Sequence, residues 1–248
     1  MKVFAIGDLH LSLEDGRLRK PMHIFGEQWR DHHEQIARDW RERVTDEDLV
    51  LMPGDLSWAR DLEEAEEDLC WLDALPGTKV LIRGNHDWWV AGSRQKLRSA
   101  LPASIRLILG DSLSVGDVLL FGTRYWQDPD LEFPGLEGIE VAPPKENAQI
   151  LEREILRLRA SVAAAKETAA SRARPFARTL CLLHFPPTDF RCTRTVATEI
   201  LSTSGADGCV FGHIHNLRDA PERVQVDGVS YWPVSCDLID FRLREITP

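Results

Sequence analysis

The stretch LVLMPGDLSW, residues 49–58, joins a short apolar run to a polar loop that contains Gly54 and Asp55. The same arrangement precedes it at KVFAIGDLH, residues 2–10, and follows it at KVLIRGNHDWW, residues 79–89. Short apolar runs that end at a glycine are typical of buried strands that turn into loops. Helical patterns separate the three runs, so the sequence predicts strand–loop–helix units of a layered α/β protein.

The rest of the chain continues this alternation. Asp31 followed by Glu34 has the form of an N-terminal cap and predicts a helix that runs through Val44. Further helices are predicted over residues 61–72, 93–101, 145–170 and 196–202. Gly116-Asp117 and Asp227-Gly228 lie between apolar runs, which is typical of hairpin turns. Further strands are predicted within residues 179–187, 208–216 and 241–246.

The length of 248 residues suits a single domain with one substantial core. Residues 127–144 contain four prolines together with glycines and acids, which indicates a surface excursion. A long helix is predicted to follow it, and we interpret residues 127–170 together as an insertion. Whether that insertion is a lid, a dimer surface or a decoration is left open.

Composition excludes several classes of protein. A formal net charge of −10 argues against binding to nucleic acid or to an anionic membrane surface, because both require clustered Lys and Arg. No apolar run approaches the roughly 20 residues that span a bilayer. The five cysteines form no CxxC pair, and with the absence of a leader-like N-terminus they predict a cytoplasmic location. An anionic substrate must then be attracted locally, for example by metal ions.

The polar loops that follow the predicted strands share an unusual composition. Five of the eight histidines of the chain fall in them, together with Asp and Asn. Because loops at the carboxyl ends of parallel strands meet in one crevice, these side chains are expected to converge. Imidazole nitrogen with carboxylate oxygen suits Mn, Fe, Zn, Co or Ni better than Mg or Ca. The candidate side chains in these loops are Asp8, His10, Asp55, Asn85, His86, Asp87, His184, His213 and His215.

The ordered series DLH, GDL, GNHD, H and GHIH resembles the signature of the calcineurin-like metallophosphoesterases, and it extends over residues 8–215. The resemblance implies a four-layer α-β-β-α sandwich with two central mixed β-sheets, the metallo-dependent phosphatase fold. It further implies that one metal is bound by Asp8, His10 and His215. The second would be bound by Asn85, His184 and His213, with Asp55 bridging both.

The implied reaction is hydrolysis of a phosphomonoester or phosphodiester, in a small-molecule or nucleotide-like substrate, by a hydroxide held between two divalent ions. Manganese is the first choice for both ions. His86 is left free to bind the phosphoryl oxygen or to protonate the leaving group, and Asp87 or Asp61 would orient it. Arg83 and Arg124 either bind the substrate phosphate or pair with surface acids, and neither alternative is preferred.

Other residues allow a functional and a structural interpretation. Trp58, Trp88, Trp89 and Trp126 can line the site, but packing between layers is preferred. His23, His32 and His33 are predicted to be surface or loop histidines. Protein phosphatases of the superfamily carry the pattern GDxxDRG, and Trp58 stands where its second Asp would be, which favours a small-substrate phosphohydrolase. Two rivals remain, a catalytically silent binding protein on the same fold and a nuclease.

Overall fold

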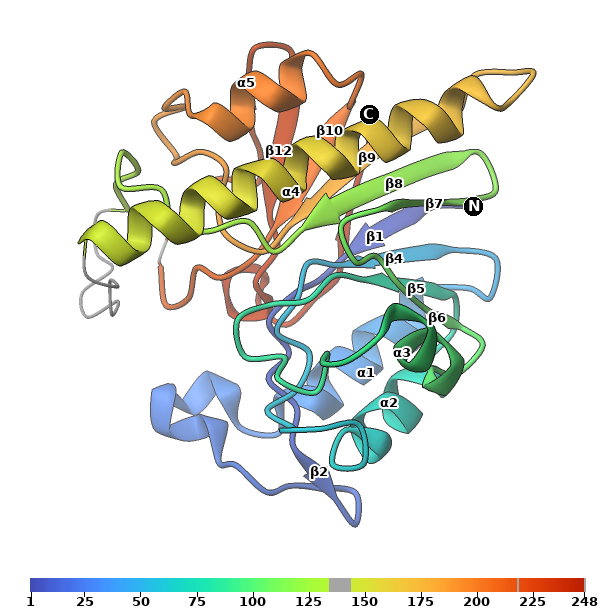
Figure 1. The fold of residues 1–248 in the computed structure, drawn as a ribbon. Coiled ribbons are helices and arrows are strands. Elements are labelled where there is room, and N and C mark those ends of the chain that lie inside the picture. The colour runs from blue at the N-terminus through green and yellow to red at the C-terminus, as the bar shows by residue number, and fades with distance from the viewer. Residues whose placement is uncertain (134–143, 218, 248) are drawn as a thin grey trace.

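The computed structural model describes residues 1–133, 144–217 and 219–247. Two β-sheets lie face to face at its centre, and helices cover the outer face of each (Figure 1). The first sheet has the strand order β13–β1–β4–β5–β6, and the second has the order β11–β12–β10–β9–β8–β7. The predicted four-layer α-β-β-α sandwich with two mixed sheets is therefore confirmed.

Each sheet is built from short strands. The first contains β1 (Val3–Ala5), β4 (Leu49–Met52), β5 (Thr78–Leu81), β6 (Ile105–Leu107) and β13 (Arg244–Glu245). The second contains β7 (Ser112–Val115), β8 (Val118–Thr123), β9 (Arg178–Leu183), β10 (Gly208–Phe211), β11 (Val224–Val226) and β12 (Val229–Pro233). A separate hairpin is formed by β2 (Leu13–Glu14) and β3 (Arg17–Leu18).

Helices α1 (His32–Arg43), α2 (Glu66–Asp73) and α3 (Arg94–Ala100) lie on the side of the first sheet. Helices α4 (Pro144–Ala170) and α5 (Val196–Ser202) lie on the side of the second, as Figure 1 shows. Three short 3-10 helices are η1 (Met22–Phe25), η2 (Glu27–Trp29) and η3 (Cys236–Ile239).

The central strands of each sheet are parallel, and antiparallel strands occur at the edges. β1, β4, β5 and β6 run in one direction while β13 is antiparallel to β1. β8, β9, β10 and β12 are likewise parallel, with β7 and β11 antiparallel at the two ends. Beyond these strands, the Gly7 N–H donates to the Val234 carbonyl at 2.7 Å and joins the two sheets. The loops that follow both sets of parallel strands therefore meet at one end of the sandwich.

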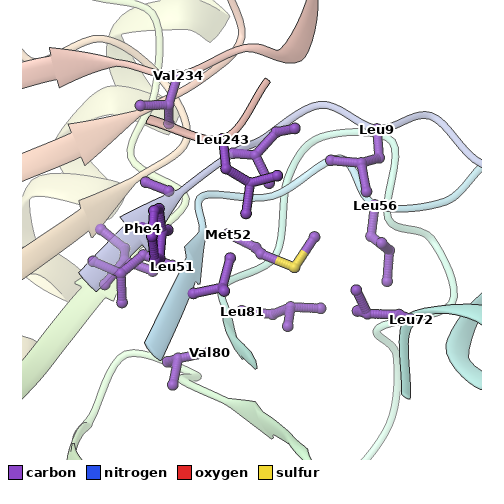
Figure 2. Packing of buried hydrophobic residues seen from close by; sticks show 14 of the residues in the cluster. Phe4, Leu9, Leu51, Met52, Leu56, Leu72, Val80, Leu81, Val234 and Leu243 are labelled. Carbon is purple, nitrogen blue, oxygen red and sulfur yellow. The ribbon is translucent and has the colours of Figure 1, made fainter. Parts of the chain in front are cut away.

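Side chains of the second sheet alternate between two hydrophobic cores, as the two-residue period of a strand requires. Leu120, Leu182 and Val210 belong to the hydrophobic cluster that also contains the apolar side chains of the first sheet. Figure 2 shows part of this cluster, including Phe4, Leu51 and Val80. Phe121 and Leu183 point outward against α4 and α5. The nearly continuous apolar runs in the sequence follow from burial on both faces.

Several local predictions are confirmed, and three are wrong. Both hairpin turns and all five predicted helices are present, although α2 begins only at Glu66. Asp31 precedes α1 but forms no side-chain capping bond, because it has a left-handed backbone with φ of 50°. His32 and His33 are buried in α1 and are not surface histidines, whereas His23 is exposed as predicted.

The region interpreted as an insertion lies partly outside the described residues, since residues 134–143 are not described. Its helix α4 crosses the outer face of the second sheet and packs on β7 and β8. Whether the chain is one domain with an insertion stays a prediction. Among the described residues, no helix combines the length and the apolar composition needed to cross a membrane.

Lys79 in β5 is fully buried, and its ammonium donates to the Leu75 carbonyl and to Ser104 Oγ at 3.1 Å. Burial lowers the pKa of Lys79 to about 8, against 10.5 for a free lysine. Between these values the unfolded chain binds more protons than the folded one, so the free energy of unfolding should rise with pH. We expect a gain of up to about 3 kcal/mol from pH 7.5 to pH 10.5 relative to Lys79→Met. Urea unfolding of both proteins measures this, and equal pH slopes would contradict it.

Candidate metal centre

All seven candidate ligands lie in loops directly after parallel strands of the two sheets. Asp8 and His10 follow β1, Asp55 follows β4, and Asn85 follows β5. In the second sheet His184 follows β9, and His213 and His215 follow β10. Because the Gly7–Val234 hydrogen bond joins the sheets at this end, the two sets of loops face each other.

The backbone of these loops is held in uncommon conformations. Asp8, His10, Asp55 and His213 all have positive φ, between 48° and 71°, a region that non-glycine residues seldom adopt. Hydrogen bonds over-determine this geometry: Asp8 N donates to Gly54 O and His10 N donates to Asp55 O, both at 3.0 Å. Such strain is retained where the surrounding structure fixes side chains for a task.

The first group of converging side chains contains Asp8, His10 and His215, whose ligand atoms lie within 4.8 Å of one another. His10 Nε2 is 3.3 Å from His215 Nε2, and His215 Nε2 is 3.7 Å from Asp8 Oδ1. These are the three residues that the resemblance assigns to one metal.

The second group contains His184, Asp55 and Asn85. His184 Nε2 lies 2.6 Å from Asn85 Oδ1 and 3.5 Å from Asp55 Oδ2. Asn85 Oδ1 is also 3.1 Å from His213 Nδ1. Asp55 Oδ2 is in turn 3.8 Å from His10 Nε2, so this carboxylate lies between the two groups.

Hydrogen bonds behind two of the histidines determine which ring nitrogen faces the centre. The Nδ1–H of His184 donates to the Pro53 carbonyl at 2.9 Å, which leaves the lone pair of Nε2 directed at Asn85 and Asp55. The Nδ1–H of His215 donates to Asp237 Oδ1 at 2.8 Å. A carboxylate or carbonyl behind a histidine is the usual arrangement around a protein-bound metal.

Asp237 was missed by the sequence reasoning. It lies in η3, 22 residues beyond His215, in a segment with no strand–loop pattern. Its second carboxylate oxygen accepts from Asn216 N at 2.7 Å, so it orients the loop as well as the ring. Buried His32 supports another ligand loop: its Nε2 lies 2.7 Å from the carbonyl of Leu9, the residue between Asp8 and His10.

Burial dominates the electrostatics of the centre. It raises the pKa of Asp8 to about 8 and also raises that of Asp55. Burial lowers the pKa of His184 to about 3 and lowers that of His10. It also acts to lower the pKa of His215, but Asp237 and Asp8 outweigh it and raise that pKa to about 9.

This donor set fits divalent cations. Two fully buried carboxyl groups lie beside imidazole nitrogens and an amide oxygen, so the cluster offers many lone pairs to a cation. His10 Nδ1 is buried without a hydrogen-bond partner among the described residues. Mixed nitrogen and oxygen donors of this kind suit divalent transition metals, and a cation would offset the cost of the buried carboxylates.

A cavity of about 240 Å³ opens beside the centre. His10, Asp55, His213 and His215 line it together with His86, whose Nδ1 is buried and has no hydrogen-bond partner among the described residues. The other lining residues are Met22, Phe25, Trp29, Trp58 and Asn216. The Trp58 ring stacks on His10 at a centroid distance of 4.8 Å, so this tryptophan forms an aromatic wall of the cavity. Trp89, by contrast, is buried in the core as predicted.

The Asp87 carboxylate is directed at backbone groups, and among the described residues no hydrogen bond joins it to the His86 ring, so a catalytic Asp87 stays a prediction. Its two carboxylate oxygens accept from the backbone N–H groups of Asp55 and Gly84 at 2.7 and 2.8 Å and from Trp89 Nε1 at 2.9 Å. Asp61 accepts instead from the backbone of Glu64. Buried Asp87 therefore joins the loops that follow β4 and β5 through hydrogen bonds to their backbones, and it holds Asp55 and Gly84 close together.

Arg83 and Arg124 do not line the cavity at the centre. They line a second cavity of about 410 Å³ with Glu154 and Arg157. Arg124 pairs with the buried Glu154 at 3.1 Å and lies over the Trp126 ring at 4.7 Å. The structure thus places the side chains of these two arginines in the lining of a different cavity from that of His86.

One comparison with known proteins identifies a family. The family model of the calcineurin-like phosphoesterases matches residues 1–217. No curated protein matches the chain. One similar solved structure is a protein of unknown function, AQ665 from Aquifex aeolicus, with 14% identity, 98% of this chain and 95% of that chain covered, and a TM-score of 0.48.

A second similar structure is the sulfate thiohydrolase SoxB of Thermus thermophilus in complex with glycerol. It shows 15% identity and a TM-score of 0.49, and the match covers 94% of this chain and 51% of SoxB. The chain therefore spans about half the length of SoxB. On the family match over most of its length, this chain belongs to the calcineurin-like phosphoesterase family, a family of metal-dependent hydrolases.

Proposed function

We propose that this protein hydrolyses a phosphomonoester or phosphodiester of a small molecule, with two divalent ions held by the seven converging ligands. Asp8, His10 and His215 would hold one ion. The other would be held by Asn85, His184 and His213, and Asp55 would contact both. When bound, such ions supply an activated water and neutralise charge on the phosphate. The observation that carries the proposal is the position of Asp55 Oδ2, within 3.8 Å of His10 and 3.5 Å of His184.

His86 is the proposed catalytic side chain that belongs to the protein itself. It lines the same cavity as Asp55 and His215, yet it takes part in neither group of ligand atoms. The Asp55 carboxylate accepts from the His86 backbone N–H at 2.8 Å, which positions the ring beside the centre. From there the imidazole can bind a phosphoryl oxygen or donate a proton to the leaving alkoxide.

The walls of the cavity favour a substrate with an apolar or aromatic group next to the phosphate. Trp58 and Trp29 form part of the lining, and Phe25 at the rim is 53% exposed. An apolar or aromatic group of the substrate can contact the Trp58 side chain, and Lys20 Nζ lies 4.2 Å from the centroid of that ring. The small volume and the acidic net charge both favour a small substrate over a nucleic acid.

We further propose that manganese is the metal used, that the protein works in the cytoplasm and that the chain forms a single domain. The mixed donor set supports a divalent transition metal over magnesium: its imidazole nitrogens suit such metals, and its carboxylate and amide oxygens suit manganese among them. The absence of paired cysteines in the sequence pattern supports a reducing compartment.

Hydrolysis of p-nitrophenyl phosphate and of bis(p-nitrophenyl) phosphate with Mn²⁺ tests the proposal directly. We expect turnover of at least one of the two esters, and we expect a chelator to abolish it. The ratio of the two rates separates a phosphomonoesterase from a phosphodiesterase. Retained metal binding without turnover of either ester would instead support a silent binding protein. A panel with Fe, Zn, Co and Ni would identify the preferred metal.

A further inference from the structure

The second cavity is lined by an unusual concentration of positive charge for a protein of net charge −10. Four arginines and one carboxylate contribute to its walls: Arg83, Arg94, Arg124, Arg157 and Glu154. It lies between α3, α4 and the ends of β5 and β8, and it shares no lining residue with the cavity at the metal centre. Figure 1 shows α4 crossing above β8, the strand that leads to Arg124.

The one carboxylate of this lining is shared between two arginines. Glu154 Oε1 accepts from Arg124 at 3.1 Å and from Arg157 at 2.5 Å, and the Glu154 side chain is only 1% exposed. A single carboxylate therefore balances one of these two guanidinium groups. Arg94 at the rim lies 3.8 Å from Asp111, a carboxylate outside the lining that it shares with Arg98.

Arg83 adds a charge that has no such balance. It is half-buried, its Nε is buried without a hydrogen-bond partner, and within the described part of the chain no carboxylate lies within ion-pair distance of it. Burial and the neighbouring Arg83 and Arg157 charges lower the pKa of Arg124 against the effect of Glu154. If the Arg124–Glu154 ion pair served only to hold α4 against β8, the additional charge of Arg83 would not be needed.

We propose that Arg83, Arg124 and Arg157 form a binding pocket for an oxyanion, a phosphate or carboxylate group, distinct from the candidate metal centre. Guanidinium groups bind such anions through two parallel N–H donors, and the surplus charge of the pocket provides the attraction. The volume of about 410 Å³ admits the anion together with part of a small molecule.

The pocket is built on the same backbone as the metal centre. Arg83 immediately precedes the Gly84-Asn85-His86 loop, and the Arg124 carbonyl accepts from His184 N at 3.1 Å. Two sources of the oxyanion fit this position: a second anionic group on the substrate, or a free anion such as phosphate. Both present the same chemistry to the three arginines.

The pocket is tested by titrating the metal-free protein with inorganic phosphate and with pyrophosphate in a calorimeter. The titration needs neither metal nor turnover, so it is independent of the proposed function, and any anion bound at the protonated His215 of the centre would bind equally to the wild type and to Arg83→Gln. We expect the wild type to bind both anions saturably. Arg83→Gln should bind them with an affinity lower by about tenfold or more, since a charge-assisted contact is removed. Arg83 is the residue to change because its removal leaves no carboxylate unpaired.

Two further variants sharpen the test. Glu154→Gln keeps an oxygen that can accept from both arginines but removes the negative charge, so phosphate should bind about tenfold more tightly. Arg191→Gln is the matched control, because Arg191 is exposed, pairs with Glu132 at 2.7 Å and does not line the pocket. Absence of phosphate and pyrophosphate binding in the wild type, or equal binding by Arg83→Gln and Arg191→Gln, would overturn the proposal.

The two possible sources of the anion are distinguished by comparing two inhibitors of p-nitrophenyl phosphate hydrolysis, hexyl phosphate and hexane-1,6-diol bisphosphate. This comparison rests on the proposed function, whereas the metal-free titration does not. Tighter inhibition by the bisphosphate that is lost in Arg83→Gln supports a second anionic group on the substrate. Equal inhibition by the two esters, with phosphate still bound by the metal-free protein, supports a free anion.

Discussion

Asp55→Ala should lose both metal binding and phosphoester hydrolysis, each by more than about 100-fold. Replacing an outer partner of a metal ligand commonly costs 10- to 100-fold in affinity, so loss of a carboxylate between two sites should cost more. Asp55 Oδ2 approaches His10 from one group of ligands and His184 from the other. Both of the proposed ions would therefore be affected by this one change. Metal content by mass spectrometry and p-nitrophenyl phosphate turnover with excess Mn²⁺ provide the two measurements.

His86→Ala is the paired variant for this experiment. It should lose about 10²- to 10⁴-fold in turnover, the range for a removed acid–base group, and retain its metal content. His86 lies beside the centre, but its ring is outside both groups of converging ligand atoms. Equal loss of metal in the two variants would show that His86 is a ligand. Far-ultraviolet circular dichroism of both metal-free variants checks that the sandwich has formed.

Gly84→Ala should reduce turnover by about 100-fold or more, although it adds a single methyl group outside the cavity. A Cβ at Gly84 would overlap the Asp55 carboxylate and backbone N, with Asp55 Cγ only 2.7 Å away. The loops after β4 and β5 must then separate, and a displacement near 1 Å at a catalytic group costs about 10²-fold. Steady-state kinetics at saturating metal, together with metal affinity by calorimetry, measures the effect.

Gly16→Ala serves as the contrasting glycine variant. Gly16 has a φ of 73°, and a Cβ there would meet no atom within 4 Å. This change should lower the free energy of unfolding by about 1 kcal/mol through backbone strain and leave turnover unchanged. If Gly84→Ala behaved in the same way, the close approach of the two loops would not control the centre.

The glycines of the GD and GNHD motifs thus have a physical role that the motifs alone do not reveal. Gly54 has a φ of 98°, and Gly84 lies against Asp55. Gly212 has the corresponding position in the second sheet, where a Cβ would overlap the Asp8 carboxylate. The absence of a side chain at Gly84 and Gly212 lets these two loops approach the carboxylates of Asp55 and Asp8.

Local patterns were sufficient to predict the five α-helices and the strands that carry the ligand loops, but not the β2–β3 hairpin or the 3-10 helices. Apolar runs that end at a glycine mark the strands, because burial on both faces selects apolar residues over a few consecutive positions. The turns at Gly116-Asp117 and Asp227-Gly228 were also predicted correctly, because hairpin turns depend on two residues. The Asp31 cap failed since the same residue types also adopt a left-handed turn.

The sequence by itself determined the strand order along the chain, the chemistry of the loops and the family to which the chain belongs. Only the tertiary structure decided which side chains meet. Asp237 accepts a hydrogen bond from the His215 ring, and Asp87 accepts from the backbone of Asp55. Arg83 and Arg124 line a separate pocket. Each of these contacts joins segments that are distant in sequence or turns a side chain within a loop. Their geometry depends on how the two sheets pack, and no short-range pattern carries that information.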